Sequence, residues 1–185
     1  MRAFIVEGHM ERKIIERLCP GTPIRLIGTN GDHVSIATMA KFIYAQMEML
    51  RDRYYPIHVI FDREKREETC DEIIDQLTSY LEQKGINRNQ FDICIPDRTI
   101  ENWFLPFLSD SGDLVFDGST RSNIEGVDGK SFVKTLFKNN KKPYVETTDG
   151  VRLFCSLSAT ICSRASPSFA RLRSMMLGHC NWLAT

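Results

Sequence analysis

The chain has 185 residues, of which 42% are hydrophobic, 10% aromatic and 26% charged, and its 24 Lys and Arg balance its 24 Asp and Glu. That length favours one domain with room for a small appendage. No stretch approaches the roughly 20 apolar residues of a bilayer-spanning helix, and no apolar run of a signal peptide opens the sequence, so we expect a cytoplasmic protein outside the membrane.

Apolar runs alternate with helical patterns along the first half of the chain. Short apolar runs predict strands at 3–6, 24–27, 57–61 and 91–95, and amphipathic segments predict helices near 10–18, 34–53 and 70–84. Strands that are apolar throughout and alternate with helices are typical of a parallel sheet covered on both faces. The expected fold class is therefore α/β, with a doubly wound, mostly parallel four-stranded sheet and a helical C-terminal extension.

The pattern changes after Pro96. A short helix is expected at 99–107, and an irregular insertion at 109–129, which is rich in Gly, Asp and Ser. Residues 130–138 have helical periodicity, 151–162 fit a helix or a strand, and Ser166-Pro167 precedes a helix that ends near Gly178. We therefore predict an α/β core at 1–108, the insertion at 109–129, and a basic helical extension at 130–185 packed on the core.

Three carboxylates follow two of the predicted strands. Glu7 follows the first strand, and Asp62 and Glu64 follow the third. In the strand order 2-1-3-4 these strands are neighbours, so the carboxylates would meet at one rim of the sheet, where a hard cation such as Mg²⁺ or Mn²⁺ would offset their repulsion. The alternative is that Glu7 and Asp62 are helix N-terminal residues that bind no metal.

Four segments of the chain resemble one protein family. They are Phe4-Ile5-Val6-Glu7-Gly8, Ile60-Phe61-Asp62-Arg63-Glu64, Arg98-Thr99-Ile100-Glu101-Asn102-Trp103 and Ser166-Pro167-Ser168-Phe169. This ordered set resembles the Toprim family, and in particular the small stand-alone Toprim proteins grouped with OLD-type and RloB-like nucleases of bacterial antiphage defence. The second Asp of the family motif is Glu64 here, which keeps the charge but changes its reach.

The resemblance implies a metal-dependent nuclease that cleaves phosphodiester bonds of DNA or RNA, transfer RNA included, as the effector of a defence system. Glu7 would be a base or bridging metal ligand, Asp62 the principal ligand of Mg²⁺ or Mn²⁺, and Glu64 a further ligand. Gly8 and Arg98, within the matching segments, would contact substrate. A separately encoded ATPase is an expected partner, because related defence proteins often work beside one.

Two more acids and a glycine are candidates near these motifs. Glu101 is either a further acidic member of the site or a cap of the following helix. The turn at 28–32 precedes a helix, so its backbone N–H groups, Gly31 among them, could hold a phosphate, and Asp32 could help to hold metal or substrate. The alternative is that this segment is only a turn.

Charge is unevenly distributed along the chain. Residues 1–129 carry 15 basic and 22 acidic side chains, whereas residues 130–185 carry 9 and 2. Lys130, Lys134 and Lys138 are spaced to line one helix face, and Lys141 and Lys142 extend it, so this stripe could neutralise backbone phosphates. In the resembling nucleases a C-terminal lysine steadies the scissile phosphate, and Lys130 is the first candidate. A solvated helix face is the simpler alternative.

Several chemistries lack a sequence signal. The segment 126–131 ends like a Walker A loop, but Ile124 stands where its first glycine should be, so ATP hydrolysis is not expected. The six cysteines include no CxxC pair and are expected to be mostly core thiols. Two rival functions remain: a non-catalytic binding or regulatory subunit of a larger ATPase complex, and nucleotidyl transfer. The substrate type, the number of metal ions and the oligomeric state are open.

Overall fold

The computed structural model describes residues 1–29, 34–108, 124–178 and 180. The chain divides into two compact units, Met1–Ile95 and Pro96–Thr185. The sequence-based boundary at 108 therefore differs from this division, which assigns residues 96–108 to the second unit. Most of the predicted insertion at 109–129 lies outside the described residues. No helix among the described residues is long and apolar enough to cross a membrane.

The first unit contains a four-stranded sheet. Its strands are β1 (Ala3–Val6), β2 (Ile24–Leu26), β3 (Ile57–Ile60) and β4 (Phe91–Cys94). They run in the order β2-β1-β3-β4, and every pairing is parallel. The register places Val6 beside both Leu26 and Ile60. The predicted α/β fold with a parallel sheet of order 2-1-3-4 is confirmed.

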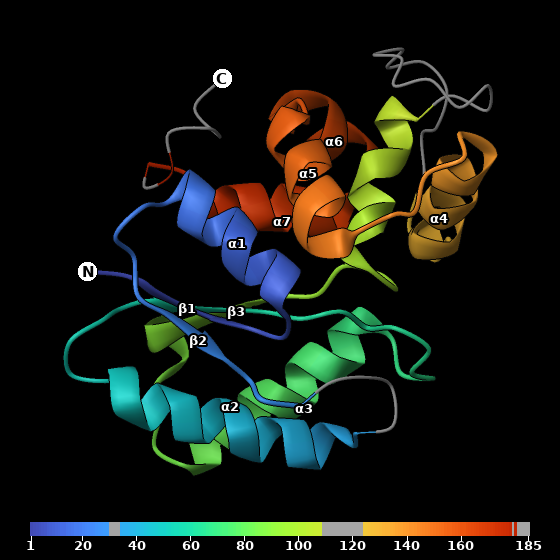
Figure 1. Cartoon of the computed structure of the whole chain (residues 1–185). Helices are drawn as coiled ribbons and strands as arrows, with labels where there is room; N and C mark the ends of the chain where they lie inside the picture. The colour runs from blue at the N-terminus through green and yellow to red at the C-terminus, as the bar shows by residue number, and fades with distance from the viewer. Residues whose placement is uncertain (30–33, 109–123, 179, 181–185) are drawn as a thin grey trace. The chain divides into compact units, whose positions relative to one another are not determined.

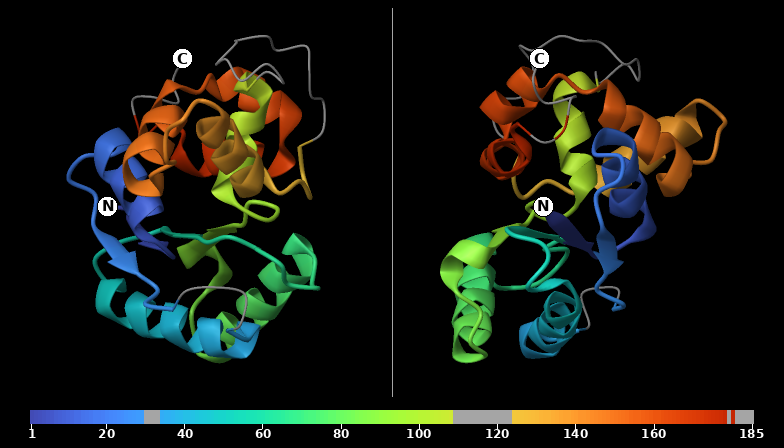
Figure 2. Two further views of the ribbon diagram at one scale, coloured as in Figure 1. Left: turned by 45° about the vertical axis from the view of Figure 1, so that its right-hand side comes forward. Right: turned by 90° about the vertical axis from the view of Figure 1, so that its left-hand side faces the viewer.

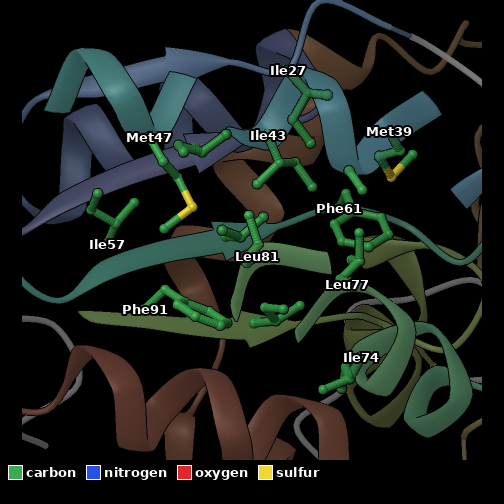
Figure 3. Close-up of a cluster of buried hydrophobic side chains, with 14 of the residues drawn as sticks. Ile27, Met39, Ile43, Met47, Ile57, Phe61, Ile74, Leu77, Leu81 and Phe91 are labelled. Atoms are coloured by element: carbon green, nitrogen blue, oxygen red, sulfur yellow. The ribbon is translucent and has the colours of Figure 1, made fainter. Parts of the chain in front are cut away.

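Helices cover both faces of this sheet. Helix α1 (His9–Leu18) lies on one face, and α2 (Ile36–Leu50) and α3 (Cys70–Gln83) lie side by side on the other (Figure 1). Between α2, α3 and the sheet lies a core of aliphatic and aromatic side chains, with Phe61 and Phe91 as its largest members (Figure 3). A short 3₁₀-helix, η1 (Arg88–Gln90), leads into β4.

Side-chain caps fix where the two long helices begin. Ser35 caps α2 by accepting a hydrogen bond from the backbone N of Thr38. Thr69 and Glu72 form a reciprocal capping box at the start of α3. Helix α2 is shorter than the predicted 34–53 because Ser35 is its N-cap and Arg51 its C-cap.

The second unit is built from short helices. Its elements are η2 (Ile100–Phe107), α4 (Gly129–Asn139), η3 (Glu146–Gly150), α5 (Val151–Ser156), α6 (Ala159–Ala165) and α7 (Pro167–Met176). Residues 151–162, which fitted either a helix or a strand, form α5 and the start of α6, with Leu157 and Ser158 between the two helices. Helices α4 and α6 pack against the 3₁₀-helix η2, and α6 packs against α7 (Figure 2).

An aromatic cluster forms the centre of this second unit. Trp103 lies 5.3 Å from Phe169 and 5.9 Å from Phe154 between ring centroids. Its indole Nε1 donates a hydrogen bond to Ser168 Oγ at 2.9 Å.

The Cys162 thiol is buried and donates to the carbonyl of Trp103, and Cys94 is also a buried thiol. Cys70 and Cys155 are thiols but only half-buried, and Cys19 and Cys180 are disulfide-bonded, so the expectation of mostly core thiols is corrected for these four.

Candidate functional site

The structure brings Glu7 and Asp62 together at the carboxyl ends of β1 and β3. The backbone N of Glu7 donates to the carbonyl of Ile60 at 3.2 Å, which continues the pairing of the two strands by one residue. The backbone N of Asp62 then donates to Glu7 Oε2 at 3.1 Å. Because parallel strands end at the same rim of the sheet, this contact follows directly from the strand order.

The alternative, that both acids are helix N-terminal residues, is wrong for Asp62. Helix α3 begins at Cys70 and its N-cap is Thr69, so Asp62 lies well before the helix. The N-cap of α1 is Gly8, in extended conformation, and Glu7 precedes it. The carboxylate of Glu7 thus contacts the end of the neighbouring strand.

Two arginines order the loop that follows Asp62. Arg66 Nη1 donates to the carbonyls of Asp62 at 3.1 Å and Arg63 at 3.0 Å. Arg63 Nη1 donates in turn to the carbonyls of Arg66 at 2.7 Å and Glu68 at 3.4 Å. These bonds tie residues 62–68 into a compact loop beside the two acids, with Arg66 only 7% exposed.

Glu64 does not complete the predicted group of three metal-binding carboxylates. Across the residues that the structure describes, no cluster of three or more His, Cys, Asp or Glu is placed to hold a metal ion. Glu64 occupies a left-handed backbone conformation with φ of 55°, which turns the chain directly after the strand end. The extended segment that would point Asp62 and Glu64 the same way is therefore absent, and this expectation is corrected.

Glu7 and Asp62 alone are compatible with one mode of Mg²⁺ binding, in which the protein supplies few of the ligands. Mg²⁺ prefers oxygen ligands and is usually held by one or two carboxylates, with water and substrate phosphates completing its shell. The two acids supply that minimum donor set, whereas a cage made only of protein side chains is not present among the described residues. Two acids at neighbouring strand ends could therefore contribute to such an ion only if water and substrate oxygens completed its shell.

The structure describes Gly8 and the first part of the predicted turn at 28–32. A Cβ placed at Gly8 would lie 2.8 Å from Glu11 Oε2, which is the end of a side chain that can move aside. Gly28 has φ of 86°, which favours glycine in this turn. Gly31 and Asp32 lie outside the described residues.

A second polar cluster lies within the second unit, around the predicted residues Glu101 and Lys130. Glu101 is 1% exposed, and its Oε1 accepts a hydrogen bond from Tyr144 Oη at 3.3 Å. Lys130 Nζ lies 2.9 Å from Glu146 Oε1. Burial raises the pKa of Glu101, and the positive charge of Lys130 opposes this shift. Burial and the charge of Glu101 likewise raise the pKa of Tyr144.

Sequence reasoning missed Tyr144 and Glu146. Both lie after a turn of the chain that returns from α4, so only the tertiary structure places them beside Glu101 and Lys130. One signal was present, because Glu146 is one of only two acids in residues 130–185 and was a natural partner for a lysine of the basic stripe. The carboxylate of Glu101 meets the Tyr144 hydroxyl, and Glu101 also lies in the first turn of η2 with a hydrogen bond to its own backbone N–H, so the cap alternative is not contradicted.

The remaining predicted phosphate-binding residues also lie in the second unit. Arg98 has a left-handed backbone with φ of 76°, and its Nε is buried without a hydrogen-bond partner among the described residues. Lys134 lies 3.9 Å from Glu146, at the limit of an ion pair. Lys134 and Lys138 line a surface hollow with Lys141 and Lys142. The lysines of the predicted basic stripe thus differ in their neighbours: Lys134 lies near Glu146, and Lys134 and Lys138 both line the hollow.

Comparisons of the chain with models of protein families, with curated proteins and with solved structures found no match.

Proposed function

We propose that the protein is a Mg²⁺- or Mn²⁺-dependent nuclease of the Toprim type, which cleaves phosphodiester bonds of DNA or RNA as an effector of bacterial antiphage defence. The observation that carries this proposal is the contact between Glu7 and the backbone of Asp62 at adjacent strand ends. It supports the proposal because two carboxylates at the rim of a parallel sheet are a donor set suited to a hard cation and a phosphate.

The chain's own residues have separate tasks in this proposal. Glu7 and Asp62 hold the cation, which when bound polarises the phosphate and lowers the pKa of water. Glu7 Oε2 holds the backbone of Asp62 at the end of the neighbouring strand before any ligand arrives. Lys130 is the candidate for phosphate contact, and its ion pair with Glu146 would have to be exchanged for that contact.

The test is cleavage of single- and double-stranded DNA, total RNA and transfer RNA in Mg²⁺ or Mn²⁺. Glu7→Gln and Asp62→Asn should each lower the rate by about 100-fold or more, and EDTA should abolish it. Asp75→Asn is the matched control, because Asp75 is an exposed acid on α3, and it should leave the rate unchanged. Cleavage that survives in both variants would refute the assignment.

A second candidate function is a non-catalytic binding or regulatory subunit, which docks on a larger ATPase complex. The observation that favours it is the lack of a three-carboxylate ligand group among the described residues. The same assay separates the two proposals when it is repeated with any co-purifying ATPase. Folded wild-type protein that cleaves none of the substrates, alone or with that partner, would favour the binding subunit.

A further inference from the structure

Four lysines of the second unit surround one surface hollow of about 360 Å³. Its lining consists of Lys134, Lys138, Lys141, Lys142, Pro143 and Tyr144. This volume lies in the range of pockets that take small molecules. The hollow therefore gathers the basic stripe into one place, where the sequence pattern alone suggested a row along a helix face.

The backbone after α4 brings the four lysines together. Lys141 has φ of 55°, and its backbone N donates to the carbonyl of Lys138 at 2.9 Å. The backbone N of Lys142 donates to the carbonyl of Phe137 at 3.0 Å. These two bonds reverse the chain directly after the helix, so that Lys141 and Lys142 return beside the last turns of α4.

An aromatic pair supports one side of the hollow. Tyr144 packs against Phe137 with ring centroids 5.2 Å apart in an edge-to-face arrangement. The Tyr144 hydroxyl is bonded to Glu101, which fixes the ring. Pro143 is exposed and adds an apolar surface at the edge. The hollow thus combines several cations with an apolar surface, which suits a phosphate that is attached to an apolar group.

Most of the positive charge here is not neutralised by acids within the described part of the chain. Glu146 Oε1 lies 2.9 Å from Lys130 Nζ and 3.9 Å from Lys134 Nζ, so it offsets positive charge in the N-terminal half of the stripe. Lys138, Lys141 and Lys142 are exposed, and within the described ranges none of them has an ion pair. Three uncompensated ammonium groups around one hollow repel each other unless an anion binds among them.

We propose that this hollow binds a terminal phosphate, a phosphomonoester dianion borne by the end of a nucleic-acid strand or by a free nucleotide. A phosphodiester within a strand carries one negative charge, whereas a terminal phosphate carries nearly two at neutral pH and matches a concentrated cluster of cations better. The part of this inference that concerns strand ends rests on the proposed nuclease function. It makes the protein selective for phosphorylated ends.

The test is a binding titration in EDTA, so that no cleavage occurs. Fluorescently labelled single strands of one sequence are compared with a 5′-phosphate, with a 3′-phosphate and with hydroxyl groups at both ends. We expect a strand with a phosphorylated end to bind about tenfold more tightly than the hydroxyl strand. Unlabelled AMP should compete for the site, and adenosine should not.

Two double variants show whether the hollow is responsible. Lys138→Gln with Lys141→Gln removes two of its cations and should abolish the preference for a phosphorylated end. Lys41→Gln with Lys84→Gln removes two exposed lysines of the first unit and should retain the preference. Unchanged thermal unfolding of both variants shows that the fold is intact, as expected for exposed side chains.

The outcomes distinguish the two sources of the phosphate. If AMP binds as tightly as a phosphorylated strand, the ligand is a free nucleotide. If the phosphorylated strand binds more tightly than AMP, the ligand is the strand end. Equal binding of all strands without competition by AMP would overturn the proposal, as would a preference that survives in Lys138→Gln with Lys141→Gln. Cleavage of a circular single strand in Mg²⁺ tests the nuclease separately, because a circle has no terminal phosphate.

Discussion

At the scale of single residues, Glu7 has a structural task as well as its proposed chemical one. Its carboxylate accepts a hydrogen bond from the backbone N of Asp62, and the side chain is only 8% exposed. An unsatisfied buried N–H costs about 1–3 kcal/mol, whereas a neutral amide oxygen can still accept this bond. Substitutions of Glu7 can therefore separate the charge from the hydrogen bond.

We predict that Glu7→Ala lowers the free energy of unfolding by about 1–3 kcal/mol, and that Glu7→Gln lowers it by less than about 1 kcal/mol. Urea unfolding followed by circular dichroism measures both values. Both variants should nevertheless lose cleavage to the same degree. Equal stability losses in the two variants would contradict the structural task of the carboxylate oxygen.

Glu101 gives the second prediction at this scale, which concerns pH. Because burial raises its pKa in the folded protein, the folded state holds its proton more tightly than the unfolded state does. The contribution of Glu101 to stability is therefore present at low pH and lost as pH rises through the folded pKa. Glu101→Gln, which cannot ionise, should be more stable relative to wild type at pH 8 than at pH 4.

Urea unfolding of wild type and Glu101→Gln at both pH values measures that difference. Glu101→Gln also leaves an acceptor for the Tyr144 hydroxyl, so the comparison reports ionisation more than a lost bond. A difference between variant and wild type that does not change with pH would contradict the prediction. The exposed Glu16→Gln on α1 is a control that should show little change.

Residues at strand ends were predictable, whereas those of the second unit were only partly so. Glu7 and Asp62 directly follow apolar runs, and the parallel order of the sheet then places them together. Glu64 was misplaced because nothing in the sequence pattern signals its left-handed backbone. Tyr144 meets Glu101 across 43 positions of sequence, a contact that only the packing of short helices creates.

At the scale of elements, helix α4 begins where its backbone touches the neighbouring segment. The backbone N of Gly129 donates to Asn102 Oδ1 at 3.0 Å, and a Cβ at this glycine would lie 2.6 Å from the backbone N of Asn102. The glycine of the Walker-like segment is thus required by close packing between α4 and η2. This explains its presence without any bound nucleotide.

We predict that Gly129→Ala lowers the free energy of unfolding by about 1–3 kcal/mol, because the added methyl group forces α4 and η2 apart. Asn139→Ala, at an exposed position of the same helix, is the control and should change stability by less than about 0.5 kcal/mol. Chemical unfolding of the two variants provides the measurement. A Gly129→Ala protein as stable as wild type would show that this close approach is relaxed in solution.

Glu125 secures the start of helix α7. Its Oε1 accepts hydrogen bonds from the Ser166 hydroxyl and from the backbone N of Ser168 at 3.1 Å. Ser166 is itself the N-cap of α7, and it accepts a bond from the backbone N of Phe169. The segment Ser166–Phe169, which carried part of the family resemblance, thus has a structural explanation in this chain.

At the scale of the whole molecule, the uneven charge of the sequence predicts a salt-dependent affinity for nucleic acid. Each phosphate neutralised on a single strand contributes a slope of about −0.7 to the logarithm of affinity against the logarithm of salt concentration. Lys138→Gln with Lys141→Gln should therefore reduce the magnitude of this slope by about 0.7 for each phosphate contact that is lost. Titrations at KCl concentrations from about 50 to about 300 mM, which bracket physiological salt, measure this slope. An unchanged slope would show that these lysines do not meet phosphates.

The sheet was predictable from the sequence, whereas the boundary between the two units of the chain was less so. Unbroken apolar strands and intervening amphipathic helices lead directly to a parallel sheet. The predicted core ended at 108, but the structure divides the chain after Ile95. The segment η2 belongs with the later helices because it packs against α4 and α6, and these contacts between distant parts of the sequence have no periodic signal.

The loop after Asp62 has a consequence for how a ligand would associate. Its arginines are bonded to carbonyls of the loop itself, so its shape is set by folding. A loop ordered in advance has little conformational entropy left to lose on association. A ligand at Glu7 and Asp62 should therefore encounter a loop that is already ordered. Amide hydrogen exchange should already be slow at Asp62 and Arg66, whose backbone N–H groups donate to Glu7 Oε2 and to the carbonyl of Arg63.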